Sequence, residues 1–77
     1  MKRYINFYNK NDENLAGEIS VNIDINILQN KYNNKINDPM LIYSYPIKPE
    51  DANFFIQFLG DNNFDFLNFD YFLECSE

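Results

Sequence analysis

Side chains alternate between two faces in three stretches of this chain, and this period of two constrains its fold more than any other feature. The stretches are residues 2–9, 15–21 and 68–75. A polar cluster at residues 9–14 separates the first two, which is typical of a hairpin with a longer loop. We therefore expect the first two stretches to pair as strands, and the third to lie beside the first.

Alternation divides each strand into a face toward the core and a face away from it. The residues expected to point inward are Ile5, Phe7, Leu15, Gly17, Ile19, Val21, Phe69, Tyr71, Leu73 and Cys75. The opposite face is expected to carry Tyr4, Tyr8, Glu18, Ser20, Asp70, Phe72 and Glu74. The register of residues 66–75 does not follow from the pattern, and a slip by one residue exchanges Tyr71 and Phe72. Both are therefore candidates for exposure.

Helical spacing indicates a first helix in the middle of the chain, with apolar residues at Ile25, Leu28 and Tyr32. Asn22 or Asp24 can cap its first free N–H groups with a side-chain oxygen. The helix should end near Asn33-Asn34.

A second helix is expected to begin at Pro49, because proline suits the first turn and the acids Glu50 and Asp51 favour the positive end of the helix dipole. Gly60 is a natural end. An apolar stripe follows the helical period at Ala52, Phe55, Ile56 and Leu59.

These elements follow the order β-β-α-(β)-α-β, where the bracketed strand is residues 41–47. That segment is either an edge strand or a lead-in to the second helix, since Pro46 cannot donate to a sheet. The pattern predicts an α+β fold, a small, mainly antiparallel sheet of 3–4 strands with two helices on one face. A chain of 77 residues supports one core, so residues 1–77 are expected to form a single domain.

Charge is unevenly distributed along the chain. Residues 49–77 contain seven acidic side chains, no Lys or Arg, and seven of the eight Phe, whereas residues 1–48 contain five acids and six bases. Apolar area within a negative surface is typical of a protein that docks on a basic partner. Surplus carboxylates that serve only solubility are the plain alternative. The candidate steering charges are Asp61, Asp65, Asp70, Glu74 and Glu77, with Glu18 on the same open face, and the candidate anchors are Tyr4, Tyr8, Tyr71 and Phe72.

The sequence lacks the residues that catalysis or metal binding commonly requires. There is no His to act as general base or metal ligand. Asp61-x-Asn63-x-Asp65 resembles the opening of a calcium loop, but Phe66 and Phe72 stand where that loop needs Gly and Glu. Cys75 is the only thiol, and a small buried filler is the simpler role for it. We therefore expect neither an enzyme nor a bound metal or cofactor.

The expected location is the cytoplasm, since a single cysteine allows no internal disulfide. No apolar run reaches the roughly 20 residues that span a bilayer. The acidic balance argues against direct binding of nucleic acid or of an anionic membrane surface.

Several short motifs resemble a small bacterial family of unknown function. They are Asp38-Pro39-Met40, Tyr45-Pro46-Ile47 and Asp70-Tyr71-Phe72-Leu73-Glu74, together with the opening Arg3-Tyr4-Ile5 and the later Gly17-Glu18-Ile19. Members of that family look similar to the immunity proteins carried beside polymorphic toxins, including those of contact-dependent growth inhibition systems.

The resemblance implies a protein that binds and neutralises the toxin domain of its own strain. Many such toxins are basic nucleases, for which an acidic inhibitor is the complement, so the expected partner is a cognate basic toxin domain. Two other classes are open. One is an acidic adaptor or DNA mimic that binds another basic protein, and the other is a structural domain that associates with itself.

Overall fold

Four strands form one antiparallel sheet in the computed structural model, which describes residues 1–32 and 38–76. The strands lie in the order β2-β1-β4-β3, with bounds β1 Lys2–Asn9, β2 Leu15–Val21, β3 Tyr45–Ile47 and β4 Phe69–Ser76. The expected hairpin is confirmed, as is the placement of the last strand beside the first. Of the segment 41–47, only its last three residues are a strand, at the edge of the sheet.

Pairing of β1 with β4 fixes the register that the sequence left open. Ile5 lies opposite Leu73 and Phe7 opposite Tyr71, and this side of the sheet faces the core. Asn6 lies opposite Phe72, on the other side. Tyr71 is therefore buried, with only 4% of its surface exposed, and the expectation that it could serve as an exposed anchor is wrong.

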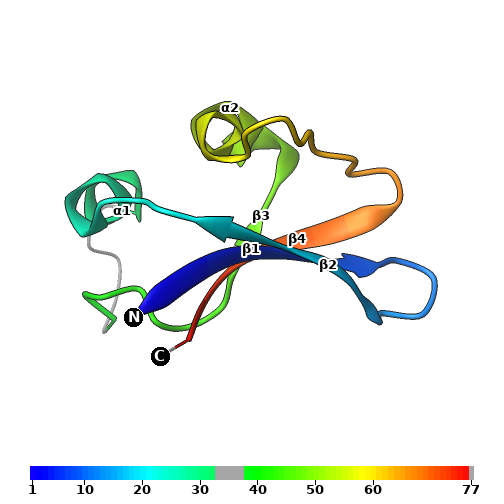
Figure 1. Ribbon diagram of the computed structural model, residues 1–77, viewed down its shortest axis with the longest axis horizontal. Helices are drawn as coiled ribbons and strands as arrows, with labels where there is room; N and C mark the ends of the chain where they lie inside the picture. The colour runs from blue at the N-terminus through cyan, green and yellow to red at the C-terminus, as the bar shows by residue number, and fades with distance from the viewer. Residues whose placement is uncertain (33–37, 77) are drawn as a thin grey trace.

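Two helical segments cover one face of the sheet (Figure 1). Helix α1 (Ile25–Tyr32) begins after Asp24, whose side-chain oxygen accepts a hydrogen bond from the Asn26 amide at 2.7 Å. Asp24, rather than Asn22, is thus the cap. The expected end of this helix, near Asn33-Asn34, lies outside the described residues.

The second helical segment starts at Pro49 as expected, but it is only partly α-helical. It consists of the 3₁₀ turns η1 (Pro49–Asp51) and η2 (Ile56–Phe58) around the short helix α2 (Ala52–Phe55). Phe55 and Leu59 are buried, whereas Ile56, expected in the inward stripe, is 39% exposed. The tighter 3₁₀ winding moves Ile56 away from the stripe. Gly60 ends the segment with φ of 64°, a left-handed conformation that favours glycine.

The core lies between these helical segments and the sheet. Its fully buried members come from both layers, and they are Ile5, Leu28, Phe55, Leu59 and Leu73. The α+β fold class expected from the sequence is therefore confirmed, with both helical segments on the same side of the sheet.

One inward residue of β2 was predicted on the wrong face. The β1–β2 register shifts between Phe7 and Tyr8, so that Gly17 lies opposite Phe7 but Leu15 lies opposite Tyr8. A β-bulge of this kind adds one residue to one strand, so the side chains on its far side point to the face opposite to the one that alternation predicts. Leu15 consequently lies on the open side of the sheet and is 54% exposed.

In the part of the chain that the structure describes, no helix has the length and apolar character needed to cross a membrane.

Candidate protein-binding face

The side of the sheet that carries no helix is the candidate site, and we call it the open face. Strand register places on it the acidic residues Glu18, Asp70 and Glu74, the aromatic residues Tyr4, Tyr8 and Phe72, and also Asn6, Ser20 and one exposed base, Lys2. Every open-face residue expected from the alternation is on this side. Tyr8 and Phe72 form an edge-to-face aromatic pair there, with ring centroids 5.6 Å apart.

Glu74 is the centre of a hydrogen-bond network on the open face. Its carboxylate accepts bonds from Asn6 Nδ2 at 2.6 Å, from the Tyr8 hydroxyl at 2.8 Å and from the Ser44 hydroxyl at 2.9 Å. Burial raises the pKa of Glu74, but the three bonds lower it by more, so that the net pKa lies below its ordinary value. The bond to Glu74 also raises the pKa of Tyr8, and burial adds to that rise. Glu74 is thus a fixed negative charge in neutral solution.

The loop before β3 brings Ser44 to Glu74, and a buried carboxylate holds that loop. Asp38 is 4% exposed and accepts bonds from the Ile42 amide at 3.1 Å, the Tyr43 amide at 3.0 Å and the Tyr45 hydroxyl at 2.6 Å. Burial raises the pKa of Asp38, but the Tyr45 bond, the two amide bonds and the nearby Arg3 charge together lower it by more. The carboxylate therefore remains ionised and keeps the loop folded.

Arg3, in the sheet, is hydrogen-bonded to the same loop. This side chain lies on the inward side of β1, is 8% exposed, and donates to the carbonyls of Met40 at 2.6 Å and Leu41 at 2.7 Å. Leu41 has φ of 52°, which is strained for a residue with a side chain, so these bonds help hold an unfavourable backbone. These bonds hold the loop beside the open face, where its residues Ile42 and Ser44 line a hollow.

Two hollows lie on either side of Glu74 and meet at Glu74 and Ser44. The first, of about 480 Å³, is lined by Tyr4, Asn6, Glu18, Ile42, Ser44, Glu74, Cys75 and Ser76. The second, of about 340 Å³, is lined by Tyr8, Glu13, Ser44, Asp70, Phe72 and Glu74. Among the described residues, every charged side chain that lines either hollow is acidic. The open face therefore offers negative charge and aromatic surface together.

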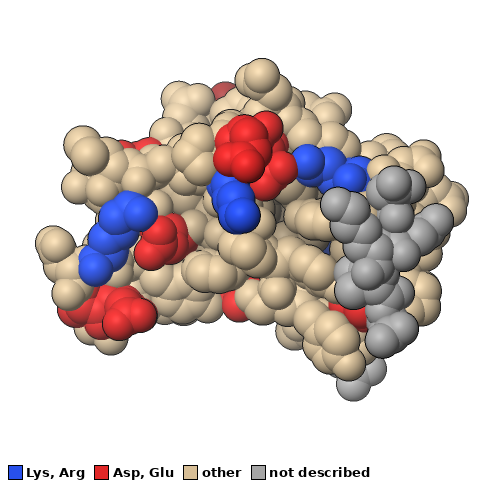
Figure 2. All heavy atoms as spheres, turned by 180° about the vertical axis from the view of Figure 1, so that it is seen from behind, with Lys and Arg blue, Asp and Glu red and all other residues tan. Residues whose placement is uncertain are grey.

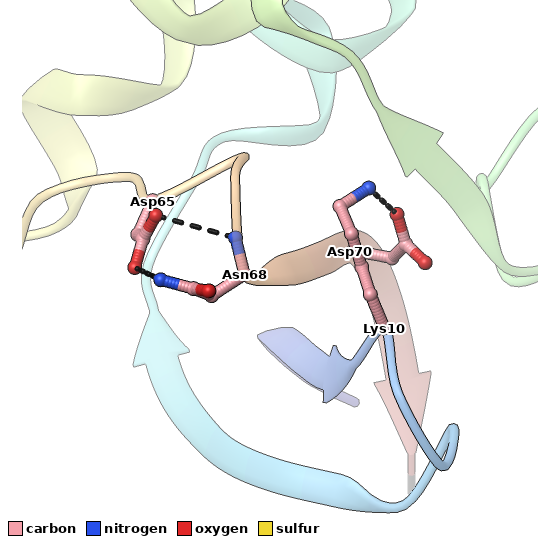
Figure 3. Close-up of polar contacts among 4 residues, drawn as sticks. All are labelled: Lys10, Asp65, Asn68 and Asp70. Atoms are coloured by element: carbon pink, nitrogen blue, oxygen red, sulfur yellow. Dashed lines mark hydrogen bonds and ion pairs between the residues drawn. The ribbon is translucent and has the colours of Figure 1, made fainter.

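Asp70 is partly neutralised at the edge of the second hollow. Lys10, in the loop between β1 and β2, lies 2.7 Å from its carboxylate, and both side chains are about half exposed (Figure 3). An exposed pair of this kind contributes little to stability and can open to admit a competing cation.

Three predicted site residues lie elsewhere or have another role. Asp61 and Asp65 belong to the connection between η2 and β4, which runs on the helix side of the sheet (Figure 1). The Asp65 carboxylate accepts bonds from the backbone and side-chain nitrogens of Asn68, at 3.4 and 2.9 Å, so it holds a turn (Figure 3). The Asp65 amide donates to the buried Tyr71 hydroxyl at 2.9 Å. Glu77 lies outside the described residues.

Asn6 is a residue of this face that sequence reasoning missed. Alternation places it between Tyr4 and Tyr8 on the open face, but its burial, with 8% of its surface exposed, is not readable from the pattern. Its Oδ1 is buried and accepts no hydrogen bond from the described residues.

Folding also changes how charge is distributed. Lys31 of α1 pairs with Asp51 of η1 at 2.7 Å, and Lys10 pairs with Asp70, so bases from the first half of the chain neutralise two C-terminal acids. Figure 2 shows acidic and basic side chains interspersed on the side opposite the view of Figure 1. The separation of charge in the sequence is therefore partly cancelled in space, and the open face, rather than the whole C-terminal third, keeps an acidic character.

The described residues contain no group of three or more His, Cys, Asp and Glu side chains that could hold a metal ion. The open face combines one fixed carboxylate, Glu74, with exposed acidic side chains and half-buried aromatic rings.

The fold and this face define a small α+β domain with an acidic sheet surface. Residues 2–74 match the model of a domain of unknown function, DUF7683, and the chain belongs to that family. No curated protein matches the chain.

Proposed function

We propose that this protein is an immunity protein, which binds a basic toxin domain of its own strain through the open face and blocks it. The observation that carries the proposal is the pair of acidic hollows around the fixed charge of Glu74. The short motifs resemble a bacterial family that looks similar to immunity proteins, and this resemblance supports the same class. The proposed role is binding without catalysis, and the proposed setting is the cytoplasm.

Electrostatic complementarity gives the proposal its physical basis. A nuclease carries positive charge where it holds phosphate, so an acidic face can accelerate its approach and occupy that surface. Glu18 is exposed and unpaired among the described residues, and Asp70 is held only by an exposed ion pair, so these two are the steering charges. Tyr4, Tyr8 and Phe72 are the proposed anchors, since half-buried aromatic side chains bury large area at little entropic cost.

The test compares two charge reversals that change the net charge equally. Glu18→Lys lies on the open face, and Asp61→Lys lies on the helix side, and both positions are exposed. Tagged wild-type protein is used to capture partners from the native organism at low and moderate salt, and the captured toxin domain is then assayed for nuclease activity. We expect wild-type protein and Asp61→Lys to bind and inhibit it, and Glu18→Lys to slow association by about tenfold at low ionic strength.

Equal loss from the two reversals would mean that the open face is not the binding surface. Capture of many unrelated basic proteins, none inhibited, would overturn the immunity function. If the tagged protein captures only further copies of itself, the immunity function is also overturned, and a domain that associates with itself is favoured.

A further inference from the structure

We propose that the free edge of β2 is a docking site for an extended segment of the protein partner, which adds a strand to the sheet and carries a basic side chain opposite Glu18. The inference rests on the proposed function and names the segment of the partner that makes the contact. β2 stands at the end of the strand order, so β1 is its only neighbour in the sheet. Among the described residues, its backbone makes no backbone hydrogen bond outside that pairing.

The two edges of the sheet differ in how they are protected. β3, at the other edge, is three residues long with Pro46 at its centre, and a short strand with a proline is poorly suited to extension. β2 is seven residues long, contains no proline and no lysine, and is buried only at Val21. A long edge strand without these devices is a template on which another strand can pair.

An extended chain is the ligand that matches the groups on this edge. In an antiparallel pair, alternate residues of the outer strand direct both their N–H and their C=O away from the sheet, and an added strand satisfies these donors and acceptors in register. Glu18 is exposed on the open face, and Ile19 is half-buried on the core side. A strand that alternates basic and apolar residues therefore places a cation beside Glu18 and extends the core beside Ile19.

Charge favours a basic partner over a second copy of this chain. Two copies paired antiparallel along β2 would bring two acidic open faces side by side, and each copy carries a net charge of −6. A pairing centred on Glu18 would place two carboxylates directly opposite each other, which is destabilising. Because Glu18 has no ion pair among the described residues, a partner strand with Lys or Arg at this position replaces repulsion by attraction.

The experiment uses short peptides as probes, so that it does not depend on capture of the partner. The β-bulge lies before Gly17, so residues 17–21 are the regular part of the edge. The ¹⁵N-labelled full chain is titrated with acetyl-Val-Lys-Val-Lys-Val-amide. With the central valine of this peptide opposite Ile19, its two lysines lie opposite Glu18 and Ser20. We expect millimolar binding, with the largest chemical-shift changes at the backbone amides of residues 17–21.

Two control peptides separate backbone pairing from charge. Acetyl-Pro-Lys-Pro-Lys-Pro-amide keeps both lysines but lacks three N–H donors, so it cannot pair as a strand. Acetyl-Val-Glu-Val-Glu-Val-amide keeps the strand and reverses the charge. Each should bind at least about tenfold more weakly than the lysine–valine peptide.

Two variants with an equal charge change locate the site. Glu18→Lys alters the β2 edge, whereas Glu50→Lys lies in η1, and both positions are exposed. Both variants should keep the dispersed spectrum of the folded chain. Only Glu18→Lys should weaken the lysine–valine peptide, by about tenfold.

Four results would each overturn the docking site: no binding at about 10 mM peptide, equal affinity for the proline peptide, shifts centred outside β1 and β2, or equal effects of the two variants. A free chain that dimerises and protects its β2 amides from hydrogen exchange would also overturn it, because the occupant would be a second copy. If the peptide fails while a captured toxin domain still binds through Glu18, the docking site is wrong and the proposed function stands. If the peptide binds as expected while no captured protein is inhibited, the docking site stands and the immunity function is overturned.

Discussion

At the scale of single residues, Asp38 and Tyr45 form a contact that holds the loop beside the open face. The Tyr45 hydroxyl donates to the Asp38 carboxylate at 2.6 Å. Burial, together with the hydrogen bond to the Asp38 charge, raises the pKa of Tyr45 to about 12. Asp38, in turn, has a lowered pKa. The two groups thus stabilise the fold as a neutral phenol and a carboxylate.

This pair gives stability a defined pH dependence. Because the folded pKa of Asp38 lies below 3.8, its contribution is present above that pH and is lost as the pH falls through the folded value. Because the folded pKa of Tyr45 lies above 10.0, its contribution is present below pH 10.0 and is lost as the pH rises toward about 12.

The variant Tyr45→Phe tests this contact. We expect it to lower the free energy of unfolding by about 1 kcal/mol at neutral pH, since it removes one hydrogen bond. It should also reduce the alkaline loss of stability between pH 10 and 12. Urea unfolding at pH 7 and pH 11 measures both effects. Tyr43→Phe is the control, because Tyr43 is 64% exposed, and equal behaviour of the two variants would contradict the assignment.

At the scale of elements, the β1–β2 hairpin depends on a cross-strand contact between Phe7 and Gly17. A Cβ atom on Gly17 would lie 2.3 Å from Phe7 Cζ, so the ring covers the glycine. The ring also stacks on Tyr71, with centroids 5.3 Å apart, and meets Phe69 edge-on at 5.1 Å. Phe7 therefore has little room to move.

We expect Gly17→Ala to destabilise the protein by about 1–3 kcal/mol, because the added methyl overpacks this contact. In a Phe7→Leu background the same substitution should cost much less, since the smaller side chain leaves space. A double-mutant cycle by chemical unfolding measures the coupling. Additive effects would show that the ring does not restrict Gly17.

At the scale of the whole molecule, the net charge of −6 opposes folding through repulsion among carboxylates. Only two ion pairs occur among the described residues, and the Lys31–Asp51 pair is the less exposed of them. Salt therefore screens more repulsion among carboxylates than attraction within ion pairs.

Added NaCl should accordingly stabilise the protein. Between 10 mM and 0.5 M we expect a gain of about 1 kcal/mol, which corresponds to about 4–8 °C in Tm for a domain of this size. Thermal unfolding followed by circular dichroism measures it. A fall in Tm with salt would show that the ion pairs outweigh the repulsion.

The strands and their faces could be predicted because local alternation carries the information. Apolar residues such as Ile5 and Leu73 predicted which side of β1 and β4 faces the core. The residues of the open face followed, because they occupy the alternate positions. The bulge that turns Leu15 outward could not, because it arises from pairing with another strand. The burial of Arg3 was equally unreadable, since its backbone partners lie up to 38 residues away along the chain. Asp38 is buried because the loop around it folds back on its carboxylate, which the pattern does not show either.

The sequence by itself determined the order of elements, the fold class and the alternation that separates the core face from the open face. These depend on side-chain periodicity within each segment. Tertiary structure decided that Phe72 rather than Tyr71 lies on the open face, that Glu74 is a fixed charge, and that Asn6 is buried beside it. The physical reason is that register, burial and hydrogen-bond partners depend on which distant segments come together, and no local pattern records that choice.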